Sequence, residues 1–165
     1  MITSADLMKA VETVWSEYTL DSTFKNWWTE SQRSSYLTLH DQEALAGQPM
    51  PYCVVQEEAS NTQGRMSSRN KTGRFETRDV IYQFNVHARQ FAGIDKGAKD
   101  IARELAEEII KFYGGHPTVQ PKQLILDNGD VLLAQYQTDY PVRTGDEEYQ
   151  WIIRYLFRLD VPVAA

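Results

Sequence analysis

The sequence predicts an α+β fold, in which one mostly antiparallel sheet carries two main helices on it. Residues 80 to 89 and 149 to 161 alternate apolar and polar side chains, as strands with one buried face do. Residues 4 to 19 and 95 to 112 instead repeat apolar side chains at helical spacing. No linker or internal repeat divides the 165 residues, so we expect a single domain.

Both expected helices have recognisable ends. Thr3 or Ser4 is a suitable N-cap for the first, and Asp95 for the second. Gly114 and Gly115 supply a stop for the second helix. The side chains expected to pack on the sheet are Leu7, Val11, Val14, Ile101, Leu105 and Ile109.

The remaining strands are expected at 52–56 and 131–140, with a possible short strand at 35–40. Asn128-Gly129 lies between apolar runs, which is the strongest short-range hairpin signal. It predicts a hairpin that joins residues 123–126 to residues 131–140, with Pro141 closing the second strand.

A polar, basic stretch at residues 60 to 74 separates two strand signals. A connection of this length without structure of its own is longer than most, and such loops are usually functional or disordered. We expect it to be mobile. Residues 60 to 79 hold five basic and two acidic side chains, a charge of +3, so the rest of this −6 chain carries −9. Such an acidic body argues against duplex DNA as the main ligand.

The composition limits the cellular compartments in which we expect the protein. Cys53 is the single cysteine, which excludes an internal disulfide and fits a reducing compartment. The start of the chain lacks the features of a signal peptide. No apolar run approaches the roughly 18 residues that a membrane span requires, so we expect no membrane association.

No constellation of catalytic residues stands out in the sequence. The three histidines lie far apart, and Cys53 lies in an apolar strand, where a buried thiol is expected. We therefore expect no enzyme activity, no metal and no cofactor. Trp27 and Trp28 are expected to pack over a sheet edge, although one of them could lie exposed.

Acidic side chains at i, i+4 spacing follow one face of the second helix. Their repulsion should be offset by pairing of Lys96 with Asp100, Arg103 with Glu107, and Lys111 with Glu108. The simple interpretation is a solvated face. The sharper one is a docking stripe for a basic surface, and residues 60–74 offer such a surface. The candidate partner-binding residues are Arg65, Arg69, Lys71, Arg74, Asp100, Glu104 and Glu108.

Three segments together resemble the tail-terminator proteins of long-tailed bacteriophages, also called tail-completion or minor tail proteins. The first is 41–55, where a Pro-Tyr step introduces a strand. The second runs from Tyr82-Gln-Phe-Asn-Val-His-Ala-Arg89 into the helix at 98–105. The third is Tyr136-Gln-Thr-Asp-Tyr140 followed by residues 149–161. The likeness is a pattern of elements with loose sequence similarity.

The resemblance implies a structural protein of the virion tail that assembles in the host cytoplasm. Family members form a ring, usually of six copies, that caps the tail tube and ends its polymerisation. The implied partners are the chain itself, the tail-tube protein and the head–tail connector, while DNA only passes through the lumen. Two alternatives stay open: a head–tail connector or stopper subunit, and a small ligand-binding or enzymatic α+β domain.

Overall fold

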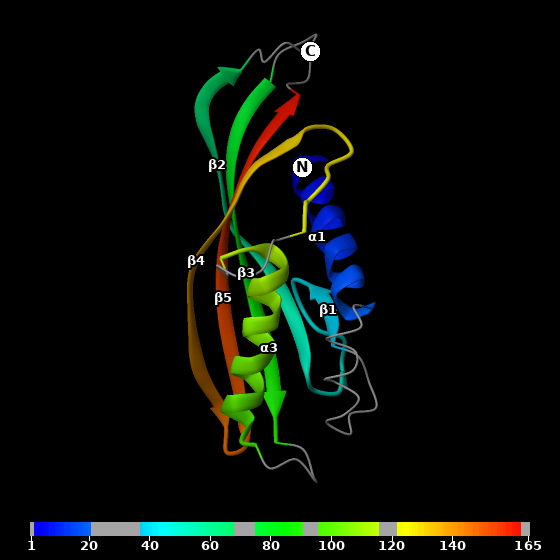
Figure 1. Cartoon of the computed structure of the whole chain (residues 1–165), viewed down its shortest axis with the longest axis vertical. Helices are drawn as coiled ribbons and strands as arrows, with labels where there is room; N and C mark the ends of the chain where they lie inside the picture. The colour runs from blue at the N-terminus through cyan, green and yellow to red at the C-terminus, as the bar shows by residue number, and fades with distance from the viewer. Residues whose placement is uncertain (1, 21–36, 68–74, 91–95, 116–121, 163–165) are drawn as a thin grey trace.

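Five strands and two helices make up the part of the chain that the structure describes (Figure 1). This computed structural model describes residues 2–20, 37–67, 75–90, 96–115 and 122–162. In chain order the elements are α1 (Ile2–Leu20), β1 (Thr38–Asp41), β2 (Tyr52–Ser67), β3 (Phe75–Arg89), α3 (Ala98–Tyr113), β4 (Asp130–Gly145) and β5 (Glu148–Pro162).

The strands form one sheet in the order β1-β2-β3-β5-β4. Only the short β1 pairs in parallel, with β2, and the three other pairings are antiparallel. Strands β3 and β5 lie in the middle and pair along their whole length, which agrees with the strong alternation in both sequences. The predicted α+β class and mostly antiparallel sheet are confirmed.

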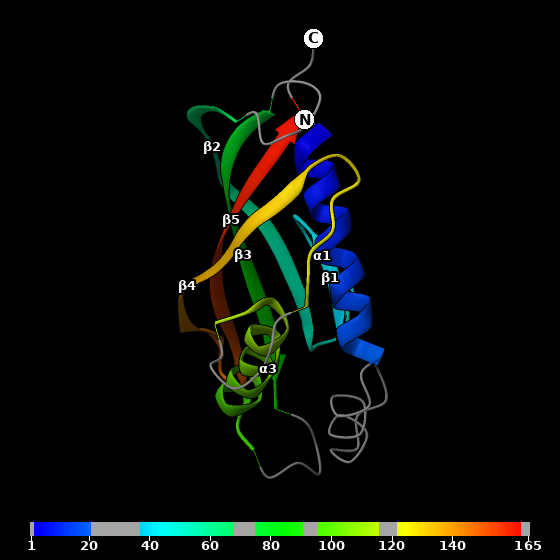
Figure 2. The same cartoon turned by 45° about the horizontal axis from the view of Figure 1, so that its top comes forward.

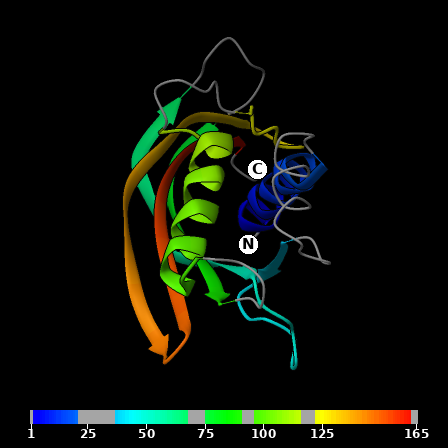
Figure 3. The same cartoon turned by 60° about the horizontal axis from the view of Figure 1, so that its bottom comes forward.

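Both helices cover the same side of the sheet (Figures 2 and 3). All six side chains expected to pack there are buried, with exposed fractions of 3% or less. They join one core with the alternate side chains of the central strands, such as Phe84 and Tyr155. Tyr113 also ties the two helices together, because its hydroxyl donates to the carbonyl oxygen of Val11 at 2.7 Å. Among the described residues, no helix has the length and apolar character needed to cross a bilayer.

The helix ends differ from the expectation at two points. α1 begins at Ile2 and includes Thr3 and Ser4, so the predicted cap at Thr3 or Ser4 is wrong. α3 begins after Gly97, in extended conformation and without a side-chain cap, so the predicted Asp95 cap is wrong. The amide of Ile101 still donates to the Gly97 carbonyl at 3.1 Å, which starts the helical pattern. The predicted stop is confirmed, because Gly114 has a φ of 120° and its amide donates to Ile110.

The predicted hairpin around Asn128-Gly129 is wrong. Residues 123–126 pair with no strand of the described chain; they run beside the helices with Leu124 and Leu126 buried. Lys9 of α1 holds this segment through a 2.6 Å contact with Asp127. The true hairpin joins β4 to β5 through Gly145–Glu148, which carries no Asn-Gly signal. Pro141 does not end β4, because β4 is an edge strand, where a missing amide is tolerated.

Gly129 nevertheless requires glycine. Its φ is +139°, and an added Cβ lies 2.5 Å from the backbone oxygen of Asp160 on the neighbouring strand. We expect Gly129→Ala to lower the free energy of unfolding by about 1–3 kcal/mol. Urea unfolding checks this against Asn128→Ala, an exposed neighbour whose loss should change stability by less than about 0.5 kcal/mol. Equal effects of the two substitutions would contradict the steric explanation.

The expected unstructured connection at 60–74 is also wrong for its first half. β2 continues to Ser67 and pairs with β3 through Met66↔Glu76 and Ser67↔Phe75. A register irregularity between Thr62 and Met66 interrupts this ladder. Polar side chains do not prevent strand formation where the neighbouring strand supplies backbone partners. Residues 68–74 lie outside the described chain.

Candidate functional site

The described part of the basic segment, which ends at Ser67, lies at one end of the sheet. Arg65 lies in the distal part of β2, whereas Arg69, Lys71 and Arg74 fall outside the described residues. The end where β2 meets β3 lies opposite the turn that joins β4 to β5 (Figure 1). α3 packs on β3, β5 and β4 and lies toward that turn. The basic end and the helix with the acidic stripe are therefore well separated within one subunit.

The acidic stripe on α3 is largely neutralised by its own helix and the residues before it. Glu104 pairs with Lys96 at 2.6 Å, and Glu108 pairs with Lys111 at 2.7 Å. Asp100 pairs with Arg103 at 3.2 Å. The predicted pair of Lys111 with Glu108 is confirmed, and the two other predicted pairings are wrong.

These ion pairs weaken the docking interpretation of the stripe. Each carboxylate already has a cation within 4 Å, so a basic partner must compete with a local one. Glu104 and Glu108 are also only about one-quarter exposed, and Oε2 of Glu104 is buried with no hydrogen-bond partner in the described chain. The stripe therefore supports the solvated-face interpretation better than the docking one.

A polar network crosses the face of the sheet that is turned away from the helices, here called the outer face. Arg154 on β5 donates to Gln83 on β3 at 3.1 Å, and Gln83 donates to Asn85 at 2.8 Å. Asn85 donates onward to Gln56 on β2 at 3.3 Å. Gln83 and Asn85 are 9% and 3% exposed, so this face is less solvated than the alternation suggests. Sequence periodicity does not reveal this burial.

The outer face also carries an ion pair. Arg158 on β5 binds Asp79 on β3 through two contacts, of 2.8 and 3.0 Å. The paired geometry suits a guanidinium and a carboxylate. Asp79 is therefore paired with Arg158 across the sheet, although it lies within residues 60–79, whose net charge is +3.

His87 lies at the margin of the same face. Its ring stacks on Tyr52 at 4.7 Å between centroids, and both line a shallow hollow of about 560 Å³ beside the β1–β2 loop. Burial lowers the pKa of His87 from its usual 6.5, and Glu148 opposes this shift. The imidazole is thus held neutral against Tyr52.

This lowered pKa predicts a loss of stability in acid. Below pH 6.5 the unfolded chain takes up a proton that the folded His87 resists, so the free energy of unfolding falls as the pH decreases. We expect His87→Gln to lose less stability than the wild type between about pH 7 and pH 5. Thermal unfolding at the two pH values measures the difference. Parallel curves for both proteins would show that His87 is not responsible.

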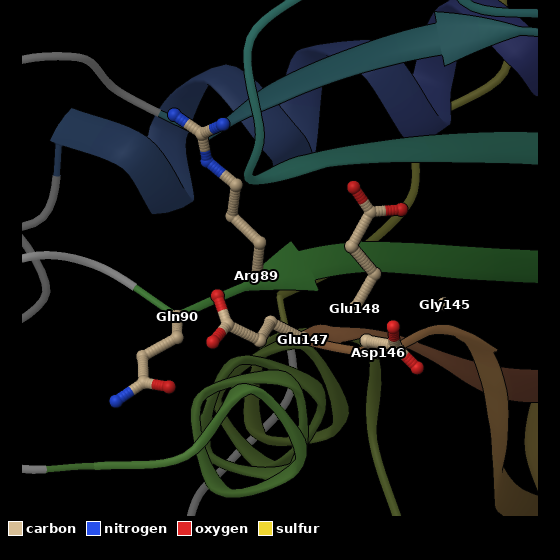
Figure 4. Close-up of a pocket in the computed structure, with 6 residues that line it drawn as sticks. All are labelled: Arg89, Gln90, Gly145, Asp146, Glu147 and Glu148. Carbon is tan, nitrogen blue, oxygen red and sulfur yellow. The ribbon is translucent and has the colours of Figure 1, made fainter.

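A third feature is an open pocket where β3 ends beside the β4–β5 turn (Figure 4). It measures about 580 Å³, and its lining includes Asp146, Glu147 and Glu148 together with Arg89. Asp146 is fully exposed and lies 3.4 Å from Arg143. This end of the sheet is therefore acidic.

The described residues do not gather into a reactive centre. No group of three or more His, Cys, Asp or Glu side chains among them could hold a metal. Cys53 is fully buried, as expected, and burial raises the pKa of its thiol, which keeps the sulfur protonated. Trp27, Trp28 and His116 lie outside the described chain.

No protein-family model matches the chain, and no curated protein sequence matches it.

Proposed function

We propose that the protein is a structural component of a long-tailed bacteriophage that caps the tail tube as a ring. In this role it ends tube polymerisation and forms the surface to which the head attaches. The proposal rests on the sequence resemblance, whose segments together cover most of residues 41 to 163. The observed order of helix, strands, helix and long hairpin is compatible with it.

The structural observation that supports the proposal is the difference in charge between the two ends of the sheet. The end where β2 meets β3 belongs to a segment of charge +3, and the opposite end presents Asp146, Glu147 and Glu148. A subunit that joins a tube on one side and a head connector on the other needs two such unlike ends. Charge of this kind orients partners more than it holds them.

Deletion of the gene from its phage tests the proposal. We expect tails longer than normal and heads without tails, because nothing stops tube growth or prepares the junction. The wild-type gene supplied in trans should restore normal length. Tails of normal length that fail only to join heads would instead support the connector alternative, and intact infectious particles would exclude both roles.

A further inference from the structure

The shallow hollow on the outer face of the sheet is rich in side-chain amides. Its volume of about 560 Å³ lies within the ~300–1,000 Å³ range of small-ligand sites. Its walls come from β2, β3, β5 and the loop that joins β1 to β2, so segments far apart in the sequence meet there. Five of the lining residues carry a side-chain amide: Gln42, Gln56, Gln83, Asn85 and Gln150.

These amides are oriented by a one-way chain of hydrogen bonds. Arg154 donates to Gln83, which donates to Asn85. Asn85 donates to Gln56, and Gln56 donates to the backbone carbonyl of Gln42. Because a guanidinium only donates, it fixes which end of each following amide is oxygen and which is nitrogen. Each of the three middle amides keeps one N–H and one oxygen lone pair that this chain does not use.

The hollow also has an apolar part. Val54 on β2 and Ile152 on β5 line it and lie on either side of Asn85 on β3. They are only 6% and 8% exposed, although the outer face is turned away from both helices. Tyr52 adds an aromatic ring, which its stacking on His87 holds in place.

The loop that forms one wall is held in a strained conformation. Gln42 has a φ of 69°, in the left-handed region that is uncommon for a residue other than glycine. Its amide donates to the carbonyl of Val55 at 2.9 Å, and its carbonyl accepts from Gln56 at 3.3 Å. Both backbone groups therefore tie the loop to β2, and the next two residues of the loop line the hollow. Strain that is held in this way clusters at ligand sites.

The hollow carries little charge. Among its lining residues in the described chain, Glu43 is the one carboxylate, and none is Lys or Arg. Arg154 at the margin is engaged by Gln83 and lies 4.0 Å from Glu58. A phosphate or carboxylate ligand would meet Glu43 and no basic side chain in the lining. This charge distribution favours a neutral ligand.

A polyhydroxylated molecule matches this lining. A hydroxyl both donates and accepts, as a side-chain amide does, so the two kinds of group can satisfy each other. A sugar ring also presents C–H groups, which gain from contact with apolar side chains such as Val54 and Ile152. Oriented amides beside an apolar surface therefore suit both parts of a sugar.

We propose that this hollow binds a neutral saccharide, either a free sugar or a unit of a neutral polysaccharide. The amides of Gln56, Gln83 and Asn85 hydrogen-bond its hydroxyls, and Tyr52 and Ile152 contact its C–H groups. A shallow site leaves much of the ligand in solvent, so we expect a dissociation constant on the order of 1 mM. The inference goes beyond the proposed function and does not depend on it, because it concerns the single subunit.

Titration of the ¹⁵N-labelled full chain with sugars tests the site by NMR. The probes are maltose, cellobiose, mannobiose and N,N′-diacetylchitobiose, and the longer soluble oligomers of each form a second arm. Side-chain amide signals report directly on the proposed binding groups. We expect the signals of Gln56, Gln83 and Gln150 to shift with at least one probe. Tighter binding of the longer oligomers indicates a polysaccharide as the source, and equal binding indicates a free sugar.

Substitution identifies the groups that bind. Gln56→Glu and Gln150→Glu each replace an N–H donor by an oxygen with little change of shape, and each should weaken binding at least about tenfold. Gln135→Glu is the matched control, because Gln135 is exposed on the edge strand β4 and lies outside the hollow. It should leave the dissociation constant unchanged. Backbone amide spectra check that all three variants are folded.

The absence of shifts with every sugar would overturn the proposal. Equal shifts of the Gln135 side-chain signal would do the same, as would equal weakening by Gln135→Glu and the two variants in the hollow. Adenine is the comparison ligand, since it offers donors and acceptors on a planar ring without hydroxyls. A response to adenine and to no sugar would assign the hollow to a nucleobase instead.

Discussion

Leu105→Ala is expected to lower the free energy of unfolding by about 2–5 kcal/mol. Leu105 is fully buried on α3, in the core that both helices form with the sheet. Its truncation removes apolar contacts and leaves a cavity that the surrounding core fills only in part. For a domain of this size the loss is a large fraction of the total stability. Urea unfolding at equilibrium measures it.

Glu107→Ala on the same helix is the matched control. Glu107 is exposed, so its truncation should change stability by less than about 0.5 kcal/mol. A loss below about 1 kcal/mol for Leu105→Ala would contradict the packing of α3 on the sheet. A change in the dependence on urea concentration would instead indicate altered two-state behaviour.

Reversal of Arg65, Arg69, Lys71 and Arg74 to Glu is expected to abolish tail capping. The change turns the +3 segment into one of −5, so it repels an acidic partner instead of attracting it. The tail-tube protein of the same phage, polymerised with the variant, should form overlong tubes. Their length in electron micrographs measures the effect.

A charge-conserving variant separates charge from shape in this experiment. Exchange of the three arginines for lysine and of Lys71 for arginine keeps the +3 charge and should largely preserve tube length. The reversed variant must also melt near the wild-type temperature, since charged side chains are rarely buried in a core. If the reversed protein still produced tubes of normal length, the basic segment would not be the docking element.

The sequence predicts the core well and the connections poorly. Side chains such as Phe84 and Leu105 follow strict periods, and a buried face leaves them one orientation. Asn128-Gly129 has the local chemistry of a hairpin, but Leu124 and Leu126 gain more from burial beside the helices than from strand pairing. The true turn at Asp146-Glu147 is set by the long pairing of β4 with β5, a tertiary effect.

The sequence also predicts the candidate surfaces only in part. Charge counting finds the basic segment but not its continuation of β2 to Ser67, which depends on backbone pairing with β3. Spacing alone also places Lys96 with Asp100, whereas the side chain reaches Glu104 instead.

The central claim is that this protein forms a ring at one end of the tail tube. Immunogold labelling of finished tails in negative stain tests it most directly. We expect label at a single end, the one that joins the head, and a ring at that end in averaged images. Label along the tube, on the head alone, or nowhere on the particle would contradict the claim.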